Sequence, residues 1–146
     1  HYGLNTEYLD WTSNINKALF FAMEPESWYS KSPYRVIYAL NKDMPAKLSN
    51  LINILTPRIA NNLRMQNQEG SFTRITIDRI FEKIISDNID SFHNDFRKVY
   101  IFCNQRKALL KDLHSKGINY QELFTGLEGV IRHCNSDILT RAYGQG

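Results

Sequence analysis

Histidine, tyrosine and hydroxyl side chains gather in the first thirteen residues of this 146-residue chain. His1 could hydrogen-bond a ribose hydroxyl or act as a base near neutral pH. Thr12 and Ser13 stand just before an apolar segment, and hydroxyls beside the free N–H groups of a helix N-terminus favour an anion or a phosphate. The opening segment follows neither a helical nor a strand period, which is typical of an ordered loop or a site. His1, Tyr2, Thr12 and Ser13 are therefore candidate ligand contacts, although helix capping alone would also explain the two hydroxyls.

A second group of candidate residues lies further along the chain. Gln68 and Glu69 precede a predicted strand, and Arg64 could bind an anion or pair with Asp10 or Glu69. Side chains alternate along an extended chain, so we expect Glu69 to point away from the face that Gln68 occupies. Asp10 lies between two apolar neighbours, so we expect it to be partly buried and to need a hydrogen bond or an ion pair.

Composition gives little support to a metal site, a membrane helix or nucleic-acid binding. Cys103 and Cys134 show no metal-ligand spacing, so no metal is expected, and a reducing cytoplasm is the default. No apolar run approaches the ~20 residues that a membrane helix needs. The net charge of +3 comes from 18 basic and 15 acidic residues without a polybasic run, so charge alone supports nucleic-acid binding weakly.

Hydrophobic patterning predicts one α+β domain over residues 1–146, with a small mixed sheet flanked by helices. The hydrophobic content of 42% is sufficient for a folded core. The expected helices are 14–23 (capped by Thr12 or Ser13), one or two turns within 58–66, 78–87, a helix from the cap Asn104 to Gly117, and 120–133. The expected strands are 35–40, 71–77 and 98–103, and the segment 51–55 could be a helix or a strand.

Burial follows from the same patterns. Trp11 and Leu9 are expected in the core beside the apolar helix 14–23. The apolar residues of the strand 98–103 are continuous, so we expect it at the centre of the sheet. Ile118 after Gly117 fits the hydrophobic contact of a Schellman cap. His133 is expected near a helix C-terminus, where a partly positive ring is favourable.

The opening segment resembles the signature of the bacterial FRG domain, His-Tyr-Gly-x-x-Thr-x-x-Leu-Asp-Trp-Thr, from His1 to Thr12. Further blocks are similar to that family in the same order: Ala18–Ala22, then Pro57, Arg64 and Gln68–Phe72, then 113–118 and 123–129. The chain departs from the family pattern at Asn5, Glu7 and Thr125–Gly126. The family's Phe-x-Arg-Gly strand does not precede His1, so the resemblance implies an FRG domain without its first strand.

This resemblance leads to a comparison with arginine-type mono-ADP-ribosyltransferases. Thr12–Ser13 followed by Ala18-x-x-Phe21 is similar to their Ser-Thr-Ser segment and helix, and Gln68–Glu69 is similar in placement to their Gln-x-Glu. In those enzymes an arginine and hydroxyls hold NAD, and a carboxylate stabilises the positive charge that develops as nicotinamide leaves. Here Gly70 occupies the position of that glutamate.

The resemblance implies the following roles. His1, Gln68 and Glu69 would be catalytic, and His1, Tyr2, Thr12, Ser13 and Arg64 would contact NAD. We expect a nucleotide-handling, ADP-ribosyltransferase-like domain of a bacterial stress or defence protein. The alternative is a non-catalytic module that binds a protein partner. In that alternative the signature segment would be architectural or would recognise the partner. The separate resemblances to family motifs also predict that His1, Thr12 or Ser13, and Gln68 meet at one cleft, although more than fifty residues separate Gln68 from the others.

Overall fold

The computed structural model describes residues 8–24, 32–43, 52–55, 62–75, 81–87 and 95–143. His1 and Tyr2 lie outside the described residues, so their predicted roles stay predictions. Within the described ranges no helix is long and apolar enough to cross a membrane.

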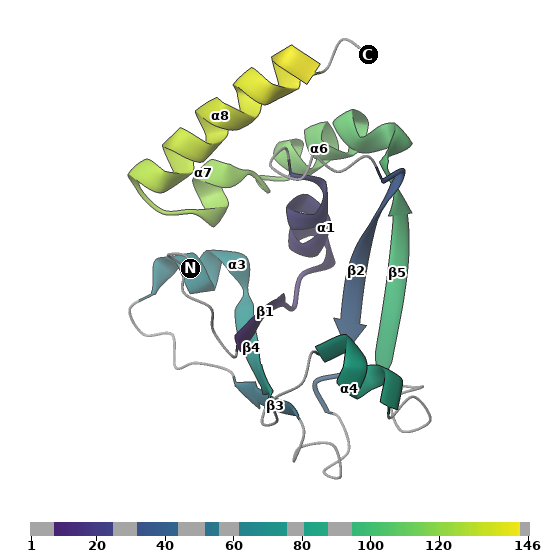
Figure 1. Cartoon of the computed structure of the whole chain (residues 1–146). Helices are drawn as coiled ribbons and strands as arrows, with labels where there is room; N and C mark the ends of the chain where they lie inside the picture. Colours follow the sequence, from purple (N-terminus) through teal and green to yellow (C-terminus); the bar gives the residue numbers. More distant parts are fainter. Residues whose placement is uncertain are drawn as a thin grey trace.

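The strands form two small antiparallel sheets (Figure 1). One sheet has the order β1 (Tyr8–Thr12), β4 (Gly70–Ile75), β3 (Ile52–Leu55), and the other pairs β2 (Tyr34–Leu40) with β5 (Phe96–Phe102). The α+β class is confirmed, and the segment 51–55 contains a strand. The described strands differ from the expected single mixed sheet because every pairing is antiparallel and no pairing joins the two sheets.

The described helices are α1 (Ile15–Met23), α3 (Leu63–Gln68), α4 (Phe81–Asp87), α6 (Arg106–Ser115), α7 (Tyr120–Leu123) and α8 (Leu127–Tyr143). Figure 1 shows α1 between the three-stranded sheet and the β2–β5 pair, with α6, α7 and α8 at one end. α1 is therefore the element that links the two sheets to the helical layer.

The start of α1 differs from the expectation. Its N-cap is Asn14, whose side-chain oxygen accepts from the backbone N–H groups of Asn16 and Lys17, so neither Thr12 nor Ser13 is the cap. The hydroxyl of Thr12 instead donates to the carbonyl of Gln68, and Asn14 has the extended backbone that a cap requires. The helix begins at Ile15, one residue later than expected.

The predicted Schellman cap of α6 is confirmed. Gly117 has a φ of 76°, and its N–H donates to the carbonyl of His114, while the N–H of Ile118 donates to the carbonyl of Leu113. The predicted cap at the other end is wrong. Asn104 lies in a 3₁₀ turn, Cys103–Gln105, that precedes α6.

The single helix expected over 120–133 is two helices, α7 and α8. The chain turns extended at Phe124 and takes a φ of 69° at Gly126, which interrupts the helix. Gly129 then lets α8 pack closely, because a Cβ there would collide with the carbonyl oxygens of Phe124 and Tyr120. His133 consequently lies inside α8 and not at its C-terminus.

The core sits where α1, α6 and α7 meet, and its buried members are Phe20, Leu113, Ile118, Tyr120, Leu123 and Phe124. Trp11 is half-buried, and its Nε1–H donates to the hydroxyl of the buried Thr73 at 2.9 Å. Leu9 is 38% exposed, so its predicted core position is wrong. β5 is also not central, because it pairs only with β2 among the described strands.

Candidate functional site

The end of β1 lies against the end of α3. The hydroxyl of Thr12 donates to the carbonyl of Gln68 at 2.7 Å and accepts from the N–H of Asn14 at 3.1 Å. The N–H of Ser13 donates to the carbonyl of Glu69 at 3.2 Å. The β1–β4 register, which pairs Thr12 with Gly70, produces this meeting. We call these two segments, residues 12–17 and 66–69, the polar junction.

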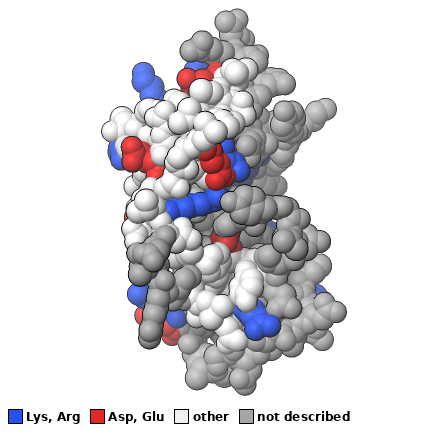
Figure 2. Space-filling view, turned by 90° about the vertical axis from the view of Figure 1, so that its left-hand side faces the viewer, with Lys and Arg blue, Asp and Glu red and all other residues white. Residues whose placement is uncertain are grey.

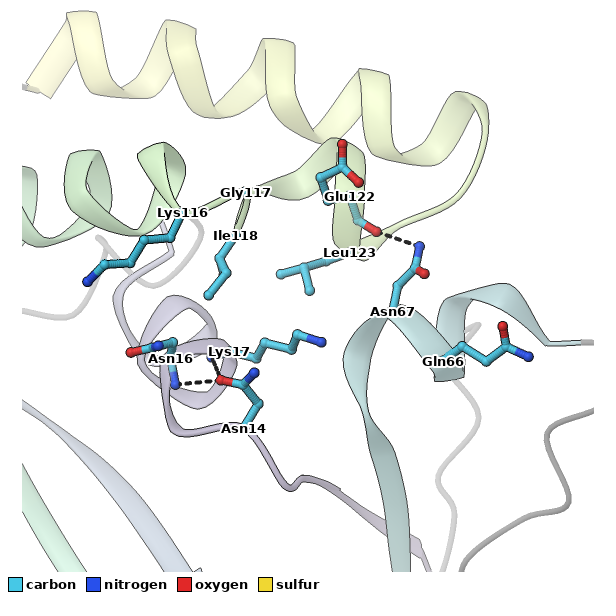
Figure 3. Close-up of a pocket in the computed structure, with 10 residues that line it drawn as sticks. All are labelled: Asn14, Asn16, Lys17, Gln66, Asn67, Lys116, Gly117, Ile118, Glu122 and Leu123. Atoms are coloured by element: carbon cyan, nitrogen blue, oxygen red, sulfur yellow. Dashed lines mark hydrogen bonds between the residues drawn. The ribbon is translucent and has the colours of Figure 1, made fainter.

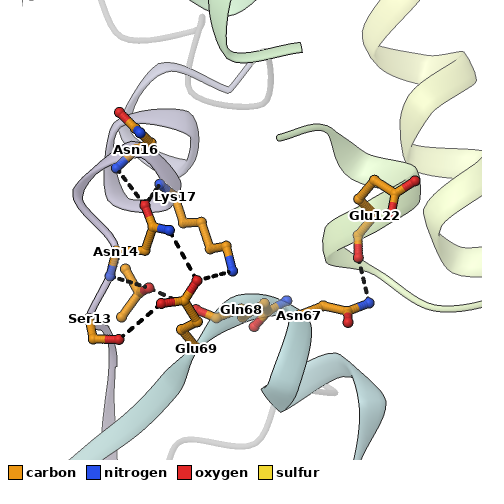
Figure 4. Close-up of polar contacts among 9 residues, drawn as sticks. Ser13, Asn14, Asn16, Lys17, Asn67, Gln68, Glu69 and Glu122 are labelled. Carbon is orange, nitrogen blue, oxygen red and sulfur yellow. Dashed lines mark hydrogen bonds and ion pairs between the residues drawn. The ribbon is translucent and has the colours of Figure 1, made fainter. Parts of the chain in front are cut away.

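Glu69 turns its carboxylate toward the start of α1 (Figure 4). It accepts from Ser13 Oγ at 3.3 Å, Asn14 Nδ2 at 3.0 Å and Lys17 Nζ at 2.7 Å. Its side chain does diverge from that of Gln68, whose amide reaches the carbonyl of Leu123, but the expected reason is wrong. Glu69 is not in an extended chain, since it caps the C-terminus of α3 with a φ of 49° in the left-handed region.

These contacts set the charge of the polar junction. The hydrogen bond from Lys17, followed by that from Asn14, lowers the pKa of the Glu69 carboxyl below its ordinary 4.5. Desolvation instead raises the pKa of the Asp10 carboxyl above 3.8, and the positive charge of Arg64 opposes that rise. Glu69 is therefore a stable carboxylate at neutral pH.

A pocket of about 640 Å³ opens beside the polar junction (Figure 3). α1, the end of α3, the α6–α7 connection and α7 supply its lining, which is Asn14, Asn16, Lys17, Gln66, Asn67, Lys116, Gly117, Ile118, Glu122 and Leu123. The lining thus combines two lysines and four side-chain amides with an apolar wall at Ile118 and Leu123. Such a pocket suits a polar or anionic molecule of small size.

Two hydrogen bonds hold α7 over this pocket. Asn67 Nδ2 donates to the carbonyl of Glu122 at 2.6 Å, and Gln68 Nε2 donates to the carbonyl of Leu123 at 3.0 Å. The Gln68 amide is thereby engaged in joining α3 to α7. It supports the wall of the pocket and is not part of the lining.

Arg64 lies in a different cluster. Its NH1 contacts both carboxylate oxygens of Glu128, at 3.3 and 3.0 Å, and Arg132 reaches the same carboxylate at 3.1 Å. Both guanidinium groups stack on Phe124, each 4.6 Å from the ring centroid. Arg64 therefore pairs with Glu128, and neither Asp10 nor Glu69 is a hydrogen-bond partner of its guanidinium.

Opposite charges also mix across the surface near this cluster. On the side that bears α3 and α7, blue and red side chains of the described residues lie interspersed (Figure 2). The described residues hold no group of three or more His, Cys, Asp or Glu placed for a metal ion.

The structure thus brings together four of the predicted site residues, Thr12, Ser13, Gln68 and Glu69, and separates Arg64 from them. These residues lie beside the pocket, and none of the five belongs to its lining. Sequence reasoning missed the pocket lining. A signal was present in Asn14-Ile15-Asn16-Lys17, where three polar residues open an otherwise apolar helix. Lys116 and Asn67 carry no motif, and only the folded chain places them beside α1.

Comparisons with known proteins bear on the resemblance to the FRG domain. No curated protein and no solved structure matches the chain. The family model of the FRG domain matches residues 1–31, a range that includes β1 and α1. The resemblance to the FRG domain predicted from the signature is therefore confirmed over residues 1–31.

Proposed function

We propose that this chain is a nucleotide-handling domain that binds NAD in the pocket beside the polar junction. It would act as an ADP-ribosyltransferase-like enzyme in a bacterial stress or defence protein. The observation that carries the proposal is the 2.7 Å hydrogen bond from Thr12 to the carbonyl of Gln68. It joins the two segments that are similar to separate elements of the mono-ADP-ribosyltransferases.

The electrostatics of the pocket support an anionic ligand. Lys17 and Lys116 bring two ammonium groups, and the N-terminus of α1 adds the partial positive charge of its free N–H groups. A diphosphate placed there would compete with Glu69 for Lys17 and with Asp112 for Lys116, and it would lie near the carboxylate of Glu122 in the lining. The volume of about 640 Å³ lies within the range of roughly 300–1,000 Å³ that is usual for small-molecule and cofactor sites.

Glu69 supports a catalytic role through its backbone. A residue other than glycine with a φ of 49° is strained, and such positions concentrate at functional sites. Its ionised carboxylate could stabilise the positive charge that develops on the ribose as nicotinamide leaves. A phosphate that bound Lys17 would compete with Glu69 for the ammonium group and so release the carboxylate for this task.

A specific observation favours the alternative of a non-catalytic binding module. Glu69 already accepts three hydrogen bonds from its own chain, and Gly70 stands where the enzymes have their glutamate. In such a module the same pocket would bind its ligand without turning it over. A nicotinamide-release assay separates the two functions.

Calorimetric titration with NAD tests binding, and two lysine variants make a matched pair. Lys116→Ala removes a pocket lysine that pairs with Asp112, whereas Lys83→Ala removes a lysine that pairs with Asp87 on α4, outside the lining. Each variant loses an ion pair between two residues that lie four positions apart on a helix surface. We expect Lys116→Ala to weaken NAD binding about fivefold or more and Lys83→Ala to leave it unchanged. Absence of heat at millimolar NAD, or equal effects of the two variants, would contradict the proposal.

Turnover is tested with Glu69→Gln, which keeps the shape of the side chain and removes its charge. For the enzyme, nicotinamide release should fall by about 100-fold or more while NAD still binds. Binding without release by the unaltered protein would favour the non-catalytic module.

A further inference from the structure

The β2–β5 sheet presents an aromatic face to solvent, on the far side of α1 from the three-stranded sheet (Figure 1). Directly opposed residues of paired strands share a face, and alternate residues along a strand do too. The register therefore places Tyr34, Tyr38, Phe96, Lys98, Tyr100 and Phe102 on one face. The opposite face carries the buried Ile37 but also Val99, which is 45% exposed, so it packs inward only around Ile37.

Large rings on this face are unusually open. Tyr34 is 42% exposed, Tyr100 is 54% exposed and Phe102 is 69% exposed. Isolated exposed apolar residues need no explanation, but several neighbouring rings on one sheet face indicate a binding surface.

The rings are arranged in pairs with a cation between them. Tyr34 and Tyr100 meet edge to face with centroids 5.3 Å apart, and Tyr38 and Phe96 stack at 5.5 Å. Lys98 Nζ lies 5.6 Å from the centroid of Tyr38 and 5.5 Å from that of Tyr100. A flat ring and an ammonium group are thus available side by side.

The charge of the two strands has one sign. Neither Tyr34–Leu40 nor Phe96–Phe102 contains an acidic residue. Lys98 is the cation of the aromatic face, since the register places Arg35 and Arg97 on the opposite face. Aromatic rings alone would suit many partners. Rings combined with a cation and without carboxylates are complementary to a partner with flat, stackable groups and negative charge.

We propose that this face binds single-stranded nucleic acid, with bases stacked on Tyr100 and Phe102 and a phosphate paired with Lys98. A duplex is a poor partner, because its bases already stack on one another and hide their flat faces. The modest net charge of +3 does not oppose the proposal, since stacking contributes independently of charge. The face shares no residue with the NAD pocket, so either proposal can fail without the other.

Fluorescence anisotropy with labelled twelve-nucleotide oligouridine and oligothymidine tests the proposal on the unaltered chain. An unlabelled duplex of the same length serves as competitor. We expect both single strands to bind and the duplex to compete poorly. Both single strands are expected to bind because stacking on aromatic rings tolerates either sugar and either base.

Two aromatic variants form the matched comparison. Tyr100→Ala should weaken binding about tenfold. Tyr8→Ala should leave it unchanged, since Tyr8 is 44% exposed but lies in the other sheet. Lys98→Ala should flatten the slope of log affinity against log salt by about 0.7, the value for one phosphate contact on a single strand.

The proposal is overturned if neither single strand binds, or if the duplex competes as well as an unlabelled single strand. Equal losses in Tyr100→Ala and Tyr8→Ala would overturn it too. Melting curves of the three variants accompany the titrations. If Tyr100→Ala lowers the melting temperature, the salt slope of Lys98→Ala decides, because that side chain is solvent-exposed and its removal costs the two contacts with the Tyr38 and Tyr100 rings without emptying a buried site.

Discussion

The polar junction and the aromatic face of the β2–β5 sheet are assembled in opposite ways. The polar junction joins segments more than fifty residues apart through side-chain and backbone hydrogen bonds, such as those from Thr12 and Lys17. The aromatic face follows from the register of two paired strands, and its rings are mostly open. Changes near the polar junction should therefore disturb folding as well as binding. Changes on the aromatic face should affect binding alone.

The largest expected contrast is between two aromatic residues. Trp11→Ala should lower the free energy of unfolding by about 3 kcal/mol, because it empties a half-buried site and leaves the hydroxyl of Thr73 without its donor. Phe102→Ala, at a ring that is 69% exposed, should change it by less than about 0.5 kcal/mol. Urea melts of both variants measure the difference. Similar losses would mean that the aromatic face is also structural.

A glycine substitution tests the wall of the pocket. Gly129→Ala should destabilise the fold by about 2 kcal/mol, because its Cβ would press α8 against the carbonyl oxygens of Phe124 and Tyr120. The shift should weaken NAD binding, since α7 supplies Leu123 to the lining, and should spare oligonucleotide binding. Asn135→Ala, at an exposed position of the same helix, is the control for melting. Unaltered stability in Gly129→Ala would show that α7 and α8 are not closely packed.

The smallest expected effect concerns pH. The folded pKa of Glu69 is lowered, so its carboxylate stabilises the fold above 4.5, and this contribution is lost as the pH falls through the folded pKa. Because Glu69 is largely exposed, the contribution should stay below about 1 kcal/mol. The stability difference between the unaltered protein and Glu69→Gln should therefore shrink as the pH falls from about 6 to about 3. A difference that grows toward acid would reverse the assigned direction.

The pKa of Asp10 shifts in the opposite direction to that of Glu69. Its folded pKa is raised by desolvation, so ionisation of this carboxyl lowers stability as the pH rises through 3.8. In melts recorded from acid to neutral pH, Asp10→Asn should abolish the loss of stability that the ionisation of Asp10 causes. A steeper decrease in the variant would contradict the burial of the carboxyl.

Local signals predicted much of the fold. The apolar run of α1, the β-branched run of β2 and the Gly117-Ile118 cap each depend on neighbouring residues, and the structure contains all three. The errors arose where tertiary packing determines the place of a strand or the end of a helix. Val99–Phe102 is an unbroken apolar run, yet its strand, β5, pairs only with β2 among the described strands. Gly126 interrupts a helix that periodicity alone would continue.

The site was predictable only in part, for the same reason. The resemblance between short motifs brought Thr12 and Ser13 into relation with Gln68 and Glu69, and hydrogen bonds join these segments. The contacts of Glu69 with the start of α1 were missed because alternation holds only in an extended chain, whereas this residue is left-handed. Lys116 joins the pocket through the turn after α6, a placement that no spacing in the sequence indicates.

The central claim is that NAD binds beside the polar junction and not on the aromatic face. An NMR titration of the ¹⁵N-labelled protein with NAD tests it most directly, because each backbone amide reports its own surroundings. The account predicts shifts for the amides of Asn16, Lys17 and Asn67, with the amides of Val99 and Ile101 in β5 unchanged. Shifts confined to β5, or no shifts at millimolar NAD, would contradict it.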